Sequence, residues 1–392
     1  MQMKKRVYGI FIGIVLATIL LNFIAWHNTK FCDLYVKYIF PLWINSYGRI
    51  TGSFSFSVGE IMIAIGVIMV IFSIVLGLIA VIFLLLAKHS IQYKRIKRVC
   101  YYFYGCFAWI LVIGSMIMTL NCFILYHCST FDEKYLQSES EDYTLEELIQ
   151  LRDYVVTQAN ILATKMERDE KGRILYQGDF QKTATESMNA LGEHYEQLSG
   201  YYPMPKPIAT SGFLSQQHMK GYYFPFSMEA NYNDMMDSMN KPATMCHELA
   251  HLKGFIYEDE ANLIGFLACI NSNDIVFQYS GYLSVLNYID NDFYEAIQKN
   301  RAIYKSHVQI SPIVRKDNVF LTEESWEKVE KKAVIKTAAA KKMSRDFVET
   351  TLVWNGIEDG SLSYTRVVGL MLDYYDTNCE VYENGTYLVQ GE

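Results

Sequence analysis

The 392-residue chain is 51% hydrophobic and carries 35 Lys and Arg against 42 Asp and Glu, a formal net charge of −7. The charge is unevenly divided, because residues 1–130 hold 11 basic and only 2 acidic residues, a balance of +9, whereas residues 131–392 have a balance of −16. This division argues against an evenly mixed soluble globule. It also argues against nucleic-acid binding, since phosphate would repel the acidic part and the basic part is mostly apolar.

Three long apolar segments dominate the first third of the chain. They cover residues 7–26, 61–87 and 101–126, and each reaches the ~20 residues that a helix needs to cross a bilayer core. Lipid offers no partner for backbone polar groups, so these segments should be helical. The first segment could instead be a cleaved signal peptide, but it is long for one and no small-residue cleavage site follows it. We therefore expect residues 1–130 to form a membrane region with three transmembrane helices.

Basic residues mark one side of this membrane region. Lys4, Lys5 and Arg6 precede the first segment, and the short link between the second and third segments holds Lys88, Lys94, Arg95, Lys97 and Arg98. By the positive-inside rule, the N-terminus and this link are expected in the cytoplasm, and everything after about residue 126 outside the cytoplasmic membrane. The reverse topology, with the C-terminal part in the cytoplasm, stays open.

Residues 131–392 have the composition of a soluble, mostly helical α+β domain. Thr144 and Glu147 form a capping-box pattern at the start of a helix, and a second helix is predicted over residues 180–198. Short strand-like pieces follow, including residues 221–226. Helical patterns then return over residues 242–253, 258–271, 282–303, 322–348 and 361–375, and residues 376–392 are predicted to be irregular or short-stranded.

The pattern H-E-x-x-H is formed by His247, Glu248 and His251. Pro242 suits the first turn of a helix and Gly254 its end, and on such a helix the two histidines lie one turn apart on the same face. Two imidazoles so placed can hold one Zn²⁺ ion, and Glu248 can reach the open coordination position as a general base. The alternative is a pair of surface histidines at helical spacing.

A third ligand is expected soon after this helix, where the sequence EDEAN supplies three acids. Glu258 and Asn262 would lie one turn apart on a second helix, so Glu258 can bind the metal while Asn262 hydrogen-bonds a ligand histidine. Glu260 points about 200° away from Glu258 and remains the alternative ligand, since both cannot face one ion. We expect Asp259 to be solvated.

Two late residues, Tyr364 and Arg366, are candidate catalytic groups. An oxyanion formed at the site usually needs one donor from outside the metal-binding helices. The alternative for both residues is a structural hydrogen bond. Cys246 adjoins His247 but points off the metal-binding face, so we expect it to pack in the core.

HELAH followed by EDEAN resembles the glutamate-zincin pattern, in which a helix with H-E-x-x-H precedes a helix with E-x-x-A-[DN]. Glu258, Ala261 and Asn262 provide the fit, with Asn in place of the more common Asp and a short interval after His251. In zincin folds an edge strand upstream of the metal helix pairs with an extended peptide substrate. Residues 221–231 (GYYFPFSMEAN) would take that place, an ordinary strand and turn being the alternative.

Nearly the whole chain resembles a bacterial membrane family catalogued as domain of unknown function 3810. The matching pieces are the three apolar segments, HELAH, EDEAN and residues 45–60, 224–231, 277–282 and 359–366. The resemblance implies a zincin-like metallopeptidase domain anchored in the membrane, and it supplies no substrate.

The sequence thus predicts a multi-pass protein of the cytoplasmic membrane with an extracytoplasmic, mostly helical zincin-like domain. The predicted function is a Zn²⁺-dependent hydrolase, a peptidase whose partners are a peptide or protein substrate and the lipid bilayer, without nucleic acid. The alternative is a sensor or assembly factor whose zincin-like domain binds a partner without hydrolysis. The presence of Glu248 argues against it, because a structural zinc site has no use for a base.

Overall fold

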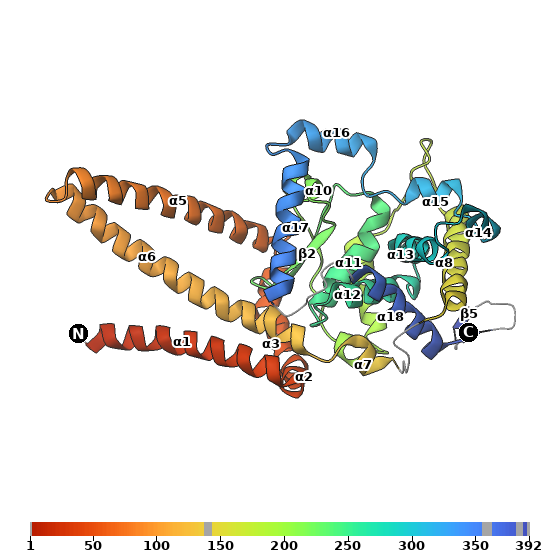
Figure 1. Cartoon of the computed structure of the whole chain (residues 1–392), viewed down its shortest axis with the longest axis horizontal. Coiled ribbons are helices and arrows are strands. Elements are labelled where there is room, and N and C mark those ends of the chain that lie inside the picture. The colour runs from red at the N-terminus through yellow and green to blue at the C-terminus, as the bar shows by residue number, and fades with distance from the viewer. Residues whose placement is uncertain (1, 137–142, 355–362, 382–386, 390–392) are drawn as a thin grey trace.

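The computed structural model describes residues 2–136, 143–354, 363–381 and 387–389 (Figure 1). Three long helices project from one side of a mostly helical globular part that also contains a small sheet. This confirms the prediction of an apolar three-helix region followed by a largely helical domain.

The three projecting helices are α1 (Gln2–His27), α5 (Val58–Leu86) and α6 (Ile91–Met118), and α6 continues through a π-helical turn, η2 (Thr119–Phe123), and a 3-10 turn, η3 (Ile124–His127). All three are long and apolar enough to cross a membrane. The third begins ten residues before its predicted start, because Ser90 caps α6 by accepting the backbone N–H of Tyr93. The basic residues 94–98 therefore lie on the first turns of α6.

The N-terminus and the hairpin between α5 and α6 lie at the same end of this bundle, far from the globular part (Figure 1). The end of α1 and the start of α5 lie beside the globular part. The eight basic residues of the N-terminus and of residues 88–98 therefore lie at one end of the three helices, and the globular part lies at the other.

Residues 28–57, which connect α1 to α5, form a chain of short helices rather than a loose link. They are α2 (Thr29–Tyr38), α3 (Phe40–Trp43), the π-helical turn η1 (Ile44–Gly48) and α4 (Arg49–Gly52). One face of this chain enters the hydrophobic core of the globular part through Cys32, Tyr35, Val36, Phe40 and Ile44. The core thus extends across residue 130, where the sequence placed a domain boundary.

The globular part contains twelve helices in the described residues: α7 (Phe131–Tyr135), α8 (Leu145–Lys165), α9 (Phe180–Leu191), α10 (Ser211–Gln216), α11 (Lys241–His251), α12 (Glu258–Ile270), α13 (Ile275–Ala296), α14 (Arg301–Ser306), α15 (Pro312–Asp317), α16 (Glu323–Lys332), α17 (Thr337–Trp354) and α18 (Ser363–Asn378). Two 3-10 turns, η4 (Glu196–Leu198) and η5 (Ser238–Asn240), complete the helical elements. Helices α9, α11, α13 and α18 pack against α12, most of whose side chains are buried, and α8 packs on α13.

Three of the predicted helices of the globular part have different bounds. The helix predicted over residues 180–198 ends at Leu191. The helix predicted over residues 282–303 begins at Ile275, because Asp274 accepts the N–H groups of Val276 and Phe277, and it ends at Ala296. There the chain reverses through Gln298 and Lys299, which both have positive φ. The helix predicted over residues 322–348 is two helices, α16 and α17.

The three-stranded sheet consists of β1 (Lys206–Pro207), β2 (Gly221–Phe224) and β3 (Glu229–Tyr232). Strand β3 is central, parallel to β1 and antiparallel to β2, with Tyr222 opposite Asn231. Strand β2 is therefore an edge strand of this sheet, and it lies against α11. A separate hairpin pairs β4 (Cys379–Val381) with β5 (Tyr387–Val389) near the C-terminus.

Candidate metal centre

Helices α11 and α12 meet at a tight turn that places the H-E-x-x-H motif. Pro242 occupies the first turn of α11, and Gly254 follows its end with φ +92°. A β-carbon built on Gly254 would lie 2.4 Å from Val36 Cγ2, so both the backbone angle and the close approach of α2 require glycine. The turn returns the chain so that α12 begins at Glu258, directly above the motif.

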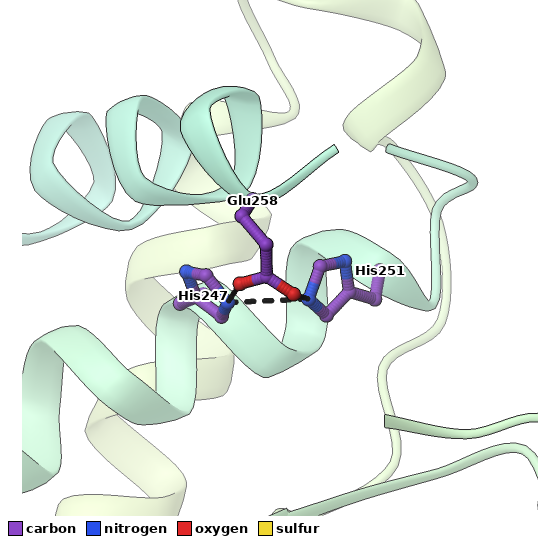
Figure 2. Close-up of side chains that lie close together, drawn as sticks. All are labelled: His247, His251 and Glu258. Carbon is purple, nitrogen blue, oxygen red and sulfur yellow. Dashed lines mark hydrogen bonds and ion pairs between the residues drawn. The ribbon is translucent and has the colours of Figure 1, made fainter. Parts of the chain in front are cut away.

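His247, His251 and Glu258 converge on one point (Figure 2). The two Nε2 atoms are 3.1 Å apart. Glu258 reaches down from the first turn of α12, with Oε2 3.1 Å from His247 Nε2 and Oε1 3.9 Å from His251 Nε2. One ligand atom from each of the three residues lies within 4.8 Å of the others. The structure therefore brings together the three residues that the sequence selected as a zinc-ligand set.

The outer nitrogens of both histidines are held by carbonyl oxygens. His247 Nδ1 lies 3.0 Å from Asn262 Oδ1, and His251 Nδ1 lies 2.7 Å from the backbone oxygen of Phe255. Because these oxygens only accept hydrogen bonds, each Nδ1 carries a proton, and in the neutral form of both rings the two Nε2 lone pairs face each other. In that form, two lone pairs on nitrogens 3.1 Å apart repel each other unless a proton or a metal cation lies between them. Burial opposes a charge on His247, but its hydrogen bond and ion pair with Glu258 raise the pKa of His247.

Burial and charge set the protonation of the group. Partial removal from water opposes ionisation of Glu258, whose side chain is still 62% exposed, but its hydrogen bond to His247 and the attraction of the histidines in their protonated form lower its pKa to about 2. Burial and the nearby His247 lower the pKa of His251 to about 4. An ionised carboxylate beside a neutral imidazole is the form in which these groups bind a metal.

Glu248 lies beside the three convergent residues and against the edge strand. Its side chain is buried, and its Oε2 has no hydrogen-bond partner in the described residues. A β-carbon built on Gly221 of β2 would lie 2.6 Å from Glu248 Oε1, so only glycine allows this approach. Burial raises the pKa of Glu248 to about 8, although the hydrogen bond from the backbone N–H of Tyr223 acts in the opposite direction. The carboxyl group is thus held ready to exchange a proton near neutral pH.

The other two acids of α12 face elsewhere. Glu260 is buried and accepts the backbone N–H of Phe131 at 2.5 Å. The prediction that Asp259 is solvated is wrong: it is only 3% exposed and forms an ion pair with Arg366. The start of α12 packs against α7 and α18, so this side of the helix is covered as well.

Arg366 lies next to the candidate centre without contacting its ligands in the structure. Its Nε is 3.0 Å from Asp259 Oδ2, and its guanidinium carbon is 5.7 Å from the ring centre of Tyr257. The side chain of Tyr364 lies outside the described part of the chain. Cys246 is buried with its Sγ 3.9 Å from that of Cys269, in agreement with the prediction that it packs in the core.

Sequence reasoning missed the part of Tyr223 in this site. Its ring centre is 6.2 Å from that of His251, and its hydroxyl donates to the backbone oxygen of Asn121 in the turn after α6. Tyr223 thus connects the histidine pair, the edge strand and the membrane helices. The sequence of the strand, Gly-Tyr-Tyr-Phe, does not alternate polar and apolar residues, so it does not show which ring faces the histidines.

Comparison with known families gives one match. The family described as "Protein of unknown function (DUF3810)" matches residues 35–372, which confirms the resemblance seen in the sequence. No curated protein and no solved structure matches the chain.

Proposed function

The chain belongs to this family, whose description assigns no activity, and from the geometry of the site we propose a membrane-anchored zinc-dependent peptidase. The observation that carries the proposal is the convergence of His247, His251 and Glu258 beside the buried carboxyl group of Glu248. Two imidazoles and one carboxylate form a donor set found in catalytic zinc sites.

The residues fit a zinc ion in two respects. The Nε2 lone pairs of His247 and His251 face each other at 3.1 Å, an arrangement that a cation would relieve. Asn262 and the backbone oxygen of Phe255 orient the two rings from behind, as partners of metal-bound histidines commonly do. Among the described residues the group holds these three ligands and no fourth, which favours an open catalytic position over a closed structural one.

The chemistry follows from the neighbouring groups. A zinc ion held there would lower the pKa of a bound water toward ~7 and polarise a substrate carbonyl. Glu248 accepts the proton of the attacking water and later returns it to the leaving amine. Its buried position keeps the carboxyl group oriented, and its partnerless Oε2 is free for this exchange.

A peptide substrate is favoured over other acyl compounds by strand β2. This edge strand borders Glu248, and an extended peptide can add to such an edge through backbone hydrogen bonds. The basic residues at the far end of the three helices favour an extracytoplasmic position for the site. Adding a membrane-impermeant label to intact cells would test whether an exposed residue of the globular part lies outside the cytoplasmic membrane.

Metal analysis of the detergent-purified protein tests the ligand set. We expect about one zinc per chain in wild type and in a control His194→Ala variant, whose histidine is exposed and outside the site. His247→Ala and His251→Ala should each lose the metal. An unchanged zinc content in both would overturn the proposal.

Catalysis needs a separate test, in which Glu248→Gln keeps the zinc ligands and removes the base. Cells with this variant should accumulate one or more proteins that wild-type cells cleave, as measured by proteome-wide comparison of peptide termini. If the peptide termini of variant and wild-type cells are identical while the Glu248→Gln protein retains its zinc, the peptidase assignment fails. The domain then binds a partner without hydrolysis.

A further inference from the structure

The segment that joins α1 to α5 has two opposite apolar faces. Its inner face packs in the core, as described above. Its outer face presents large apolar side chains that are 58–64% exposed: Leu34, Tyr38 and Leu42 at four-residue spacing, and Ile50 eight residues after Leu42. Phe54 and Phe56 extend this face beyond α4 and are 44% and 49% exposed. A soluble protein rarely leaves so continuous an apolar stripe facing water.

The polar side chains beside this stripe are satisfied within the segment. Asn45 Nδ2 donates to the backbone oxygen of Pro41 at 2.9 Å, and Ser46 Oγ donates to that of Leu42 at 2.5 Å. Ser53 Oγ donates to the backbone oxygen of Ile50 at 2.6 Å. Side chains bonded in this way need less water, which suits a place at the edge of a hydrocarbon layer.

The charges of the segment also suit a lipid surface. It holds three cations, Lys30, Lys37 and Arg49, and a single acid, Asp33. Asp33 is turned away from the stripe, because its carboxylate accepts the N–H and hydroxyl of Ser129. Of the cations, Lys37 pairs with Glu196 and Arg49 lies over the ring of Tyr201, so both reach toward the globular part. The outer face is therefore apolar and carries no acidic side chain, which suits helices that lie in a membrane interface.

The position of the segment specifies its partner. Tyr8 and Trp26, both half exposed, lie about 27 Å apart along α1 at 1.5 Å per residue, close to the ~30 Å of a hydrocarbon core. Such aromatic residues mark the two interfaces of a span. The segment begins with α2, three residues after Trp26, and ends where α5 starts, at the globular end of the helices (Figure 1).

We propose that residues 29–57 form a lipid-binding platform, whose Leu34–Leu42–Phe54 face lies in the interfacial layer of the bilayer crossed by α1, α5 and α6. The occupant of this face is phospholipid, because the stripe is continuous with two membrane helices at its ends.

The platform and the end of the third span hold the candidate metal centre at the membrane surface through direct contacts. Gly254, at the end of α11, lies against Val36 of the platform. The hydroxyl of Tyr257, which precedes Glu258, donates to the backbone oxygen of Tyr126 at the end of the third span, at 2.6 Å. The depth at which the platform lies in the bilayer therefore sets the distance of the candidate metal centre from the membrane surface, whatever reaction the site performs.

Photocrosslinking of the full-length protein tests the platform. The photoreactive amino acid p-benzoylphenylalanine would replace Leu42 or Phe54, whose exposed side chains leave the inner face intact. The protein would be reconstituted in vesicles of phosphatidylethanolamine and phosphatidylglycerol, irradiated, and analysed by mass spectrometry for added phospholipid. Thermal unfolding in detergent would establish that each variant folds.

Two positions provide matched controls. Ile68, in the middle of α5 and 64% exposed, should give lipid adducts, and Val334, between α16 and α17 and 98% exposed, should not. We expect yields at Leu42 and Phe54 near that of Ile68, on the order of tenfold above Val334. Yields equal to that of Val334 would overturn the proposal, as would crosslinks to a second copy of the chain in place of lipid.

Discussion

Glu229 and Lys206 form an ion pair of 2.5 Å whose side chains are only 1% and 3% exposed. The same carboxylate accepts the backbone N–H groups of Val58 and Gly59 at 3.1 and 2.7 Å, at the N-terminus of the membrane helix α5. Lys206 also donates to the backbone oxygen of Thr51 at 2.6 Å. The positive end of the α5 dipole thus rests on a buried anion of the central strand, which joins the membrane region to the sheet beside the site.

The first prediction concerns this pair. Lys206→Met or Glu229→Ala should each lower the free energy of unfolding by about 3–5 kcal/mol, because each leaves an uncompensated buried charge or unpaired donors. The exposed i,i+4 pair of Lys328 and Glu324 offers a matched control, whose disruption should cost less than about 1 kcal/mol.

The measurement is thermal or chemical unfolding of the detergent-purified variants. Glu229→Gln keeps an acceptor for the α5 N-terminus, so the double variant Lys206→Met with Glu229→Gln should lose less stability than the sum of its single variants. A strictly additive double variant would show that the two residues act independently.

The second prediction concerns Asn262, which holds His247 from behind through a hydrogen bond of 3.0 Å. Asn262→Ala should lower zinc affinity by about 10–100-fold, because the ring loses its orientation. Asn262→Asp keeps the acceptor and adds a negative charge, so its affinity should equal or exceed that of wild type. Competition with a chelator of known affinity measures both, and equal affinities in all three proteins would contradict this role.

Local spacing is what made the metal centre predictable from sequence. The helical repeat alone places His247 and His251 on one face, and the same repeat pairs Glu258 with Asn262 on the next helix. These relations depend on residues three or four positions apart, so they do not require knowledge of the tertiary fold. The three membrane helices were predictable for a similar reason, since length and composition suffice.

Contacts between distant segments were not predictable in this way. The choice between Glu258 and Glu260 depends on Phe131, more than a hundred residues upstream, whose N–H holds Glu260 away from the histidines. The prediction for Asp259 failed because its partner Arg366 is equally distant. The inner face of residues 29–57 is another example, because apolar periodicity shows that two faces exist without showing which one meets the protein and which one meets lipid.

The third prediction separates the two acids as metal ligands. Glu258→Gln should lose zinc, because the amide is a weak ligand for this metal, whereas Glu260→Gln should retain it. Zinc content of the two purified variants decides the question. Loss of zinc from Glu260→Gln with retention in Glu258→Gln would reverse the assignment.

The fourth prediction concerns Glu260 and the dependence of folding stability on pH. Burial raises its pKa to about 8, so the folded protein holds this proton more tightly than the unfolded chain, where glutamate titrates near 4.3. The resulting stabilisation is fully present below about pH 4 and is lost as pH rises to about 8. The neutral Glu260→Gln keeps an acceptor for Phe131, so its unfolding temperature should exceed that of wild type by a margin that widens between about pH 5 and about pH 9. A constant margin would contradict a buried titrating carboxyl group.

The fifth prediction concerns Arg366, which the sequence selected as an oxyanion donor and the structure pairs with Asp259. The Arg366 side chain is 46% exposed and that of Asp259 only 4%, so Arg366→Ala should cost about 1–2 kcal/mol, between the values for exposed and buried pairs. The double variant with Asp259→Asn should recover most of this loss, because no buried charge then lacks a partner. Once a substrate is known, turnover separates the roles: a pairing role predicts that the double variant recovers activity together with stability. An oxyanion donor predicts instead a loss of about 100-fold or more that Asp259→Asn cannot restore.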